Sequence, residues 1–458
     1  MRRPRSLSAP RVRAVAVLRE VLEEGGRGTA LLAARGEGLG KEDQGLLREI
    51  VLGVLRQKAR LDGELAAVSR VPLERLAPNL REILEVALYQ VRFLDRVPAY
   101  AAVDEAVRHA RESGGEGAGN LVNAILRNLL RRPHLAKGED RGLPAEASAK
   151  AGEGATTATL LASRFSHPLF LVERWLERFG EETTRSILAA DNASSGLDLL
   201  VNPHHTSRAL LAGALAEEGI SAEISPLVPL GLTVTSGNPL RSSLFREGHF
   251  SVQDIGSQAL PLLLPPGDTL VDLAAAPGGK SFAALFSERV RRAVALDRSA
   301  ARLRLFTENV RRLGVSRALP VAGDFRSPPF PSERFDRVLL DAPCSGTGTL
   351  RKHPEIRYRV SPQAIERLAR AQEEAVLAAA GLLAPGGLLL YSTCSLEEEE
   401  NERVVERALA RDAGLDTAPI AAPEALCPFV SGNRFQLLPD ATHDGFTAHL
   451  LRRRASRG

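Results

Sequence analysis

Two of the three cysteines end apolar, strand-like runs in almost the same way. Cys344 follows the run VLLDAP and Cys394 follows LLLYST, and each precedes a serine. In open α/β sheets, residues at the carboxyl ends of strands face the region that binds ligands. A pair of thiols at such a place indicates covalent chemistry through a thiolate, and Pro-Cys alone leaves open which thiol attacks. Cys427 lies in no motif, and we expect it to be a buried structural thiol.

A glycine-rich turn follows another strand-like run, in the sequence DLAAAPGGKS at residues 272–281. Its end matches a triphosphate-binding loop, but Ala274 stands where that loop needs its first glycine. The dinucleotide fingerprint G-x-G-x-x-G is absent from this turn. A third interpretation is a nucleoside site without a phosphate, in which the glycines let the backbone approach the ligand.

Acidic residues at successive strand ends favour the nucleoside site. Asp297 comes 25 residues after Asp272, near the spacing at which an acidic residue binds ribose hydroxyls in such folds. Asp324 and Asp341 follow the next two expected strands. Four carboxylates would repel phosphates, whereas they suit a sulfonium cofactor with a free ribose. The alternative for any one of them is ordinary helix capping.

Strands and helices must alternate from residue 251 onward to position these groups. The pattern predicts an α/β fold with a doubly wound, mostly parallel sheet. The expected strands are residues 269–273, 293–297, 318–322, 337–341 and 387–392. The expected helices are residues 281–286, 300–313 and 363–383.

The part before residue 251 divides into three segments of different character. Residues 1–134 show helical apolar spacing throughout and predict an all-α bundle, and residues 135–158 resemble a linker. Residues 159–250 predict a small α/β module, with strands at 197–202 and 230–236 around a helix at 207–218. Residues 1–134 hold 23 Lys+Arg against 17 Asp+Glu, an excess that suits a polyanion such as RNA, although a solvated helical surface would show it too.

Composition restricts the class and the compartment. The 458 residues carry a net charge of +4 and only three cysteines, an odd number that argues against a disulfide framework. No apolar run reaches the length of about 18 residues that a membrane span needs. The Arg-rich residues 1–14 lack the apolar stretch of a signal peptide. We therefore expect a cytoplasmic protein without a membrane segment.

Four consecutive glutamates, Glu397–Glu400, follow Cys394. They predict an acidic first turn of a helix, which the helix dipole favours. No His or Cys cluster accompanies them, so we expect no metal there.

Several stretches resemble S-adenosylmethionine-dependent RNA cytosine-5 methyltransferases. They are DLAAAPGGKS, LDAPCSGTGTLRKHPEIR at residues 340–357, YSTCSLEEEENE at 391–402, FSVQDIGSQ at 250–258 and HDGF at 443–446. The helical N-terminal part resembles the NusB-type RNA-binding domain, and the combination resembles the RsmB (Sun) type of bacterial small-subunit ribosomal RNA methyltransferases. The family commonly has Cys at position 274 and often Trp at position 358, where this chain has Ala274 and Tyr358.

The resemblance implies a Rossmann-like methyltransferase domain at residues 251–458 and S-adenosyl-L-methionine as cofactor. It implies that Cys394 is the nucleophile, that Cys344 assists proton removal and release, and that Asp341 and Lys280 orient the cytosine. The implied cofactor-binding residues are Ala274, Ala275, Ala276, Pro277, Gly278, Gly279, Lys280, Asp297, Arg302, Asp324 and Asp341.

The implied partner is small-subunit ribosomal RNA, bound by a monomer without a metal ion. A transfer RNA substrate, or a non-catalytic RNA-binding or assembly factor, is the alternative. The base must be unstacked to reach such a pocket. The basic residues after the Pro-Cys motif are candidates to contact phosphates, with a solvated loop as the alternative: Arg351, Lys352, His353 and Arg357.

Overall fold

The structure is a computed structural model that describes residues 7–26, 28–131, 156–194 and 196–455. Most of the expected linker, residues 135–155, lies outside the described residues. The chain divides into two compact units. We call Met1–Asn192 with Leu350–Arg359 the helical unit, and Ala193–Thr349 with Val360–Gly458 the sheet unit.

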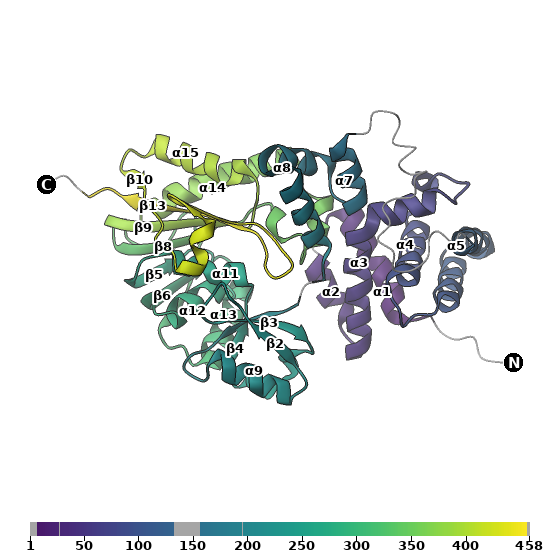
Figure 1. Ribbon diagram of the computed structural model, residues 1–458, viewed down its shortest axis with the longest axis horizontal. Helices are drawn as coiled ribbons and strands as arrows, with labels where there is room; N and C mark the ends of the chain where they lie inside the picture. Colours follow the sequence, from purple (N-terminus) through teal and green to yellow (C-terminus); the bar gives the residue numbers. More distant parts are fainter. Residues whose placement is uncertain (1–6, 27, 132–155, 195, 456–458) are drawn as a thin grey trace. The chain divides into compact units, whose positions relative to one another are not determined.

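The helical unit contains α-helices and short 3-10 turns, as the apolar spacing predicts. Its α-helices are α1 (Ala9–Glu24), α2 (Gly28–Gly36), α3 (Lys41–Ala66), α4 (Pro78–Phe93), α5 (Ala99–Leu130), α7 (Thr157–Phe165) and α8 (Leu169–Asn192), shown in Figure 1. α5 bends at Gly115, whose φ of 79° is a value that glycine adopts at little cost. α7 and α8 fall within the module expected at residues 159–250 but group with the N-terminal helices. The expected domain boundaries stay a prediction.

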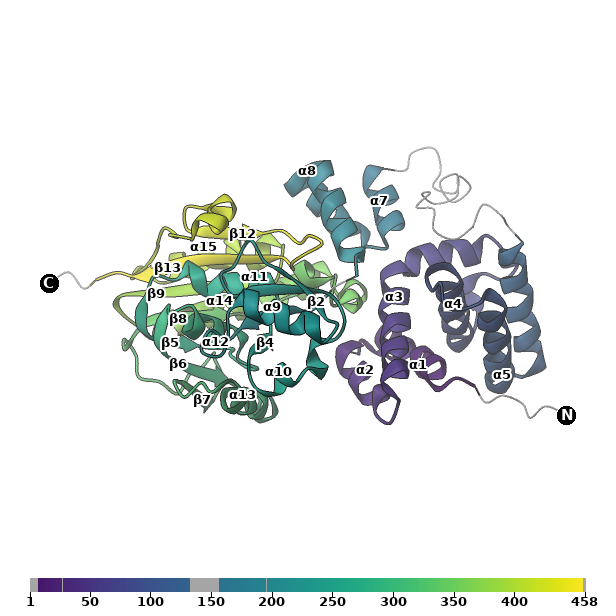
Figure 2. The same cartoon turned by 60° about the horizontal axis from the view of Figure 1, so that its bottom comes forward.

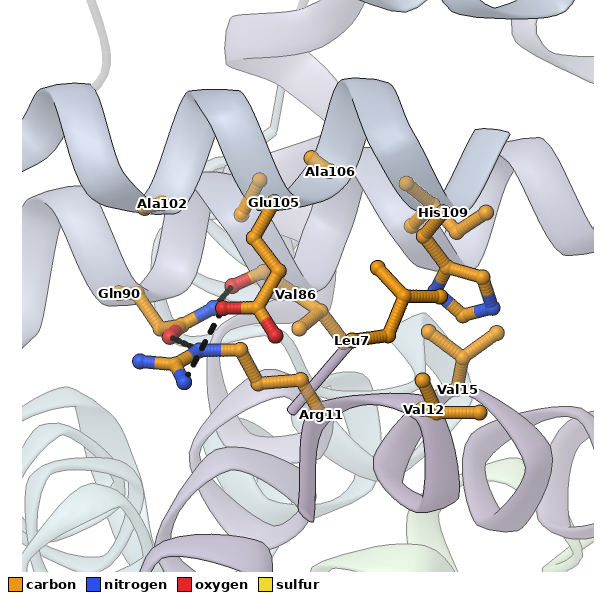
Figure 3. Close-up of a pocket in the computed structure, with 12 residues that line it drawn as sticks. Leu7, Arg11, Val12, Val15, Val86, Gln90, Ala102, Glu105, Ala106 and His109 are labelled. Carbon is orange, nitrogen blue, oxygen red and sulfur yellow. Dashed lines mark hydrogen bonds and ion pairs between the residues drawn. The ribbon is translucent and has the colours of Figure 1, made fainter. Parts of the chain in front are cut away.

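α1 packs against α4 and α5 around a small pocket (Figure 3). Its floor is apolar, with Val12 and Val15 among the lining residues. At one side Arg11 donates from Nε to Gln90 Oε1 over 2.5 Å and pairs through Nη1 with Glu105 Oε2 at 3.2 Å. The ion pair therefore ties α1 to α5 while the apolar residues supply the buried area.

The segment Leu350–Arg359, with the 3-10 turn Pro354–Tyr358, packs inside the helical unit. Arg351 and Arg357 are only 2% and 3% exposed. The expectation that these two arginines contact phosphates is therefore wrong, because both side chains are buried in protein. Nothing tests that expectation for Lys352 and His353, which stays a prediction.

The sheet unit begins with a four-stranded antiparallel sheet in the order β2-β3-β1-β4. The strands are β1 (Asp198–Val201), β2 (Ser221–Ile224), β3 (Gly231–Ser236) and β4 (Phe250–Val252), and α9 (Arg208–Glu217) packs beside them. Strands at 197–202 and 230–236 around a helix at 207–218 were predicted from the sequence. The two outer strands were not.

The larger sheet has the order β11-β12-β13-β9-β8-β5-β6-β7, with β10 paired to β13. Its strands are β5 (Gly267–Asp272), β6 (Val290–Asp297), β7 (Ala318–Ala322), β8 (Phe335–Asp341), β9 (Leu383–Thr393), β10 (Leu415–Thr417), β11 (Val430–Ser431), β12 (Arg434–Leu437) and β13 (Phe446–Arg453). β5 to β9 are parallel, and β13 adds an antiparallel edge to β9. The predicted doubly wound, mostly parallel sheet is confirmed.

Helices cover both faces of the larger sheet (Figures 1 and 2). They are α11 (Ile255–Ala259), α12 (Gly279–Phe286) and α13 (Ala300–Leu313) on one face, and α14 (Pro362–Ala380) and α15 (Glu402–Arg411) on the other. Neighbouring residues of β5 face opposite sides of the sheet: Leu270 belongs to the same buried cluster as Phe282 of α12, and Val271 to the same one as Val376 of α14. This packing holds the carboxyl ends of β5, β6, β8 and β9 at one edge.

Within the described ranges, no helix is long and apolar enough to cross a membrane.

Candidate functional site

The glycine-rich turn connects β5 to α12 at the carboxyl edge of the sheet. The side chains of Ala275 and Ala276 pack in the core, whereas Pro277 is exposed. Gly278 has a φ of +113°, and a Cβ there would lie 2.3 Å from the Phe282 ring. Glycine is thus required both by the backbone conformation and by the close approach of α12.

Asp297, at the end of β6, is 5% exposed and lies beside this turn. Its Oδ1 accepts a hydrogen bond from the Ser299 backbone N–H at 2.8 Å. Its Oδ2 lies 3.2 Å from Arg302 Nη1 as an ion pair, yet that buried oxygen accepts no hydrogen bond. Arg302 also donates through Nη2 to the Ala276 carbonyl, which joins α13 to the turn. The predicted residues Asp297, Arg302 and Ala276 therefore form one cluster.

Asp272, at the end of β5, is buried and accepts a hydrogen bond from the Ser281 hydroxyl at 2.8 Å. Burial raises its pKa to about 6. Asp324 differs, because it pairs with Arg326 two residues later at 2.6 Å, and those hydrogen bonds lower its pKa to about 2. These hydrogen bonds of Asp324 stay within its own loop and do not reach the cluster around Asp297.

Lys280, in the first turn of α12, lies between the glycine-rich turn and the cysteines. Its Nζ lies 2.7 Å from Asp341 Oδ2 and 5.7 Å from the centre of the Phe446 ring. Burial opposes its charge, but the carboxylates of Asp341 and Asp272 outweigh burial and raise the pKa of Lys280. Asp341 also accepts from the Ser392 hydroxyl at 3.0 Å. Lys280 and Asp341 thus form an ion pair held in place from both β8 and β9.

The two cysteines meet at this edge, with 3.3 Å between the Sγ atoms of Cys344 and Cys394. The hydrogen bond with Cys394 and burial raise the pKa of Cys344 well above its usual value, and the carboxylates of Glu400 and Asp341 add to the effect. Cys394, in contrast, interacts electrostatically with the ammonium of Lys280. The surroundings therefore keep Cys344 as a thiol and offer a cation to Cys394.

The D-G-F motif closes the site from β13. Gly348, in the Pro-Cys loop, donates its N–H to the Cys394 carbonyl at 2.9 Å and accepts at its own carbonyl from Gly445 N at 2.7 Å. A Cβ on Gly348 would lie 2.6 Å from the Gly445 carbonyl oxygen. Asp254, which caps α11 through Gly256 N at 2.8 Å, also accepts from the Asp444 backbone. The motifs at residues 250–258, 340–349, 391–402 and 443–446 therefore surround one place.

Two expectations from the sequence need correction. Cys427 is exposed rather than buried, with its thiol directed at the carbonyls of Ala422 and Pro423 at 3.5 Å each. Glu398–Glu400 form a 3-10 turn, and α15 begins only at Glu402. Glu400 is fully buried near the cysteines. Glu397 is buried as well, and nothing in four consecutive glutamates marks which of them are buried. No cluster able to hold a metal ion occurs among the residues that the structure describes.

Three segments of the chain match known families. Residues 259–452 match the family described as 16S rRNA methyltransferase RsmB/F, residues 8–131 match the NusB family, and residues 167–241 match the ferredoxin-like domain of RsmF/B-like methyltransferases.

Full-length relatives and a solved structure agree with these matches. The probable ribosomal RNA small subunit methyltransferase B of Synechocystis is 33% identical over 89% of this chain and 91% of its own length. Ribosomal RNA small subunit methyltransferase B of Pseudomonas putida is 34% identical over 98% and 100%. The crystal structure of PH0851 has a TM-score of 0.75 at 25% identity, covering 98% of this chain and 100% of that one. The chain is therefore an enzyme that belongs to the RsmB/F family of 16S rRNA methyltransferases.

Proposed function

We propose that this enzyme transfers a methyl group from S-adenosyl-L-methionine to C5 of a cytidine in small-subunit ribosomal RNA. The proposed route is a covalent adduct between Cys394 and C6 of the base. The observation that carries the proposal is the arrangement of the two thiols. Cys394 and Cys344 lie 3.3 Å apart beside the Lys280–Asp341 ion pair, and the hydrogen bond with Cys394, burial and the carboxylates of Glu400 and Asp341 raise the pKa of Cys344.

The residues around the glycine turn fit the proposed cofactor. Asp297 Oδ2 is a buried acceptor without a hydrogen bond, at the strand end where ribose hydroxyls bind in such folds. The side chains of Ala275 and Ala276 pack in the core, so they do not obstruct a ligand beside this turn. When bound, the cofactor supplies an electrophilic methyl group on a sulfonium. The expectation that Asp324 and Asp341 also bind the cofactor stays a prediction.

Cytosine C5 is a weak nucleophile, so the base must be activated. Addition of the Cys394 thiolate to C6 breaks the aromatic system and makes C5 enamine-like, and C5 then takes the methyl group. Loss of the C5 proton to water and departure of the Cys394 thiolate restore the C5–C6 double bond. The Lys280–Asp341 pair orients and polarises the ring, and Cys344 assists the proton removal and release.

A raised pKa suits Cys344 to assist the release of Cys394 from C6. A group that stays a thiol at neutral pH can donate its S–H to the neighbouring Cys394 sulfur at 3.3 Å. Such a donor stabilises the thiolate before attack and again as the thiolate leaves C6. Chemistry through free thiols also fits a reducing cytoplasm, where we place this enzyme.

Small-subunit ribosomal RNA is proposed as the substrate because the relatives named above are ribosomal RNA small subunit methyltransferases. The excess of Lys+Arg in residues 1–134 supports RNA binding there. We propose that the enzyme acts as a monomer without a metal ion.

Labelled cofactor incubated with small-subunit ribosomal RNA, and separately with transfer RNA, tests the proposal. We expect label in ribosomal RNA at C5 of one cytidine, mapped by bisulfite sequencing, and no label with Cys394→Ala. Label only in transfer RNA would refute the substrate, and label outside C5 would refute the reaction.

A further inference from the structure

Glu400 is a buried carboxylate that the proposed chemistry does not use. Its Oε1 accepts from the Ser345 backbone N–H at 2.8 Å, and its Oε2 accepts from the Ser395 hydroxyl at 2.6 Å and from the Ser345 hydroxyl. Ser345 and Ser395 are the residues that directly follow the two cysteines. One carboxylate therefore holds both cysteine loops at equivalent positions.

Further contacts fix Glu400 itself. Gln372 of α14 donates from Nε2 to Glu400 Oε1 at 3.0 Å and to the Pro343 carbonyl at 2.9 Å, so it also holds the residue before Cys344. The Tyr391 hydroxyl of β9 donates to the Glu400 carbonyl. With four donors on two oxygens, the hydrogen-bonding capacity of the carboxylate is well used. The group is thus fixed by α14 and β9 as well as by the two loops.

We propose that Glu400 is a positioning residue for methyl transfer, whose carboxylate sets the separation and orientation of the Cys344 and Cys394 thiols. The inference rests on the proposed roles of those thiols. A buried carboxylate costs free energy unless fully hydrogen-bonded, and a neutral side chain could fill the same space. The burial of Glu400 is explained by the need to hold two loops, far apart in sequence, so that the two sulfur atoms lie 3.3 Å apart.

The carboxylate has a second consequence for the same two thiols. Its negative charge is one of the causes that keep Cys344 protonated, after the hydrogen bond with Cys394 and burial. Glu400 thereby helps to keep Cys344 protonated beside Cys394. A residue that only stabilised the fold would not change the titration of one cysteine relative to the other.

The test compares Glu400→Gln and Glu400→Ala with Glu398→Gln as a matched control. Glu398 lies two residues away, is exposed and pairs with Arg403 at the surface, so its replacement removes the same charge outside the network. Glu400→Gln keeps the size and the acceptor for Ser345 N but presents N–H groups to the two hydroxyls. Glu400→Ala removes the whole bridge.

Two measurements are made on the full chain. The first is kcat and KM for S-adenosyl-L-methionine with ribosomal RNA. The second is the rate of alkylation of Cys344 and of Cys394 by iodoacetamide as a function of pH, read by mass spectrometry of the two peptides without RNA. We expect kcat to fall about tenfold in Glu400→Gln, the effect of one lost hydrogen bond, and about 10²-fold in Glu400→Ala, with KM unchanged. Alkylation of Cys344 should begin at lower pH in Glu400→Gln, and Glu398→Gln should match the wild type.

A kcat within twofold of wild type in Glu400→Gln, or an unchanged pH profile of Cys344 alkylation, would overturn the inference. If Glu400→Ala fails to fold, Glu400→Gln alone decides. Failure of the proposed function has a different signature, because methylation that survives Cys394→Ala would refute the covalent route and leave the alkylation profiles to report on Glu400.

Discussion

Replacing Arg357 with Met should strongly destabilise the helical unit. The buried guanidinium donates through Nη1 to the Arg56 carbonyl at 3.1 Å, to the Ser166 carbonyl at 3.3 Å and to Asn192 Oδ1 at 2.8 Å. Nη2 donates to the Asp191 carbonyl at 3.0 Å. One side chain therefore joins α3, the end of α7 and the end of α8 to the segment that follows Cys344 along the chain.

The magnitude follows from the acceptors that the substitution abandons. A buried acceptor left without its donor costs about 1–3 kcal/mol, and three of these four hydrogen bonds are buried, while the one to Asn192 is partly buried. Loss of a charge that also faces the buried Asp191 carboxylate adds to the cost, while relief from burying the guanidinium offsets part of it. We expect about 3–5 kcal/mol in total, a large share of the 5–15 kcal/mol that stabilises a typical domain.

Hydrogen exchange followed by mass spectrometry measures this effect unit by unit, which suits a chain that need not unfold in one step. In Arg357→Met, peptides from α3, α7 and α8 should exchange faster by the factor that this free energy predicts. Arg185→Met is the control, since Arg185 of α8 makes a half-exposed i,i+4 pair with Glu181 worth at most about 1 kcal/mol. Equal exchange in the two variants would refute the reasoning.

Three further substitutions test separate parts of the account. Gly348→Ala should lower kcat at least tenfold without loss of cofactor binding, because the new Cβ would displace the Gly445 carbonyl 2.6 Å away. Wild-type kinetics would show that catalysis does not need the close packing of Gly348 against Gly445. The pKa of Asp272 rises from 3.8 to about 6 on folding, so the native state binds its proton more tightly than the unfolded state does. The free energy of unfolding should therefore fall by about 3 kcal/mol as the pH rises from about 4 to about 6. Guanidinium denaturation of Asp272→Asn should lack that decline, and an unchanged pH dependence would refute the assignment. Gly53→Ala should destabilise α3 against α4, because its Cβ would lie 1.9 Å from the Tyr89 ring; a melting temperature within about 1 °C of wild type would contradict the packing.

Elements with local signals were predictable from the sequence. α13 runs from Ala300 to Leu313 as predicted, because Ser299 caps its start through Arg302 N and Gly314 ends it in the left-handed conformation. The predicted strand at 318–322 is β7 to the residue. α14 ends at Ala380, before the predicted residue 383, because Leu383 begins β9, and an apolar run does not show where a helix stops and a buried strand starts.

Features that depend on distant partners were not predictable. β13 exists as a strand because it pairs with β9, over 50 residues earlier in the chain. Arg357 was expected near phosphates, and its carbonyl partners come from Arg56 and Ser166, which no local pattern connects to it. Motif spacing found the cysteines and Lys280, but Glu400 could not be distinguished among its neighbours, because burial there is decided by Gln372 and the two serines.

The most direct test of the central claim is the identity of the cysteine that bonds to RNA. Cys344→Ala incubated with S-adenosyl-L-methionine and small-subunit ribosomal RNA should accumulate a denaturation-resistant protein–RNA adduct, and peptide mass spectrometry should find the nucleotide on Cys394. Cys394→Ala should form no adduct and transfer no methyl group. An adduct on Cys344 in the Cys394→Ala enzyme would contradict the account and reverse the two roles.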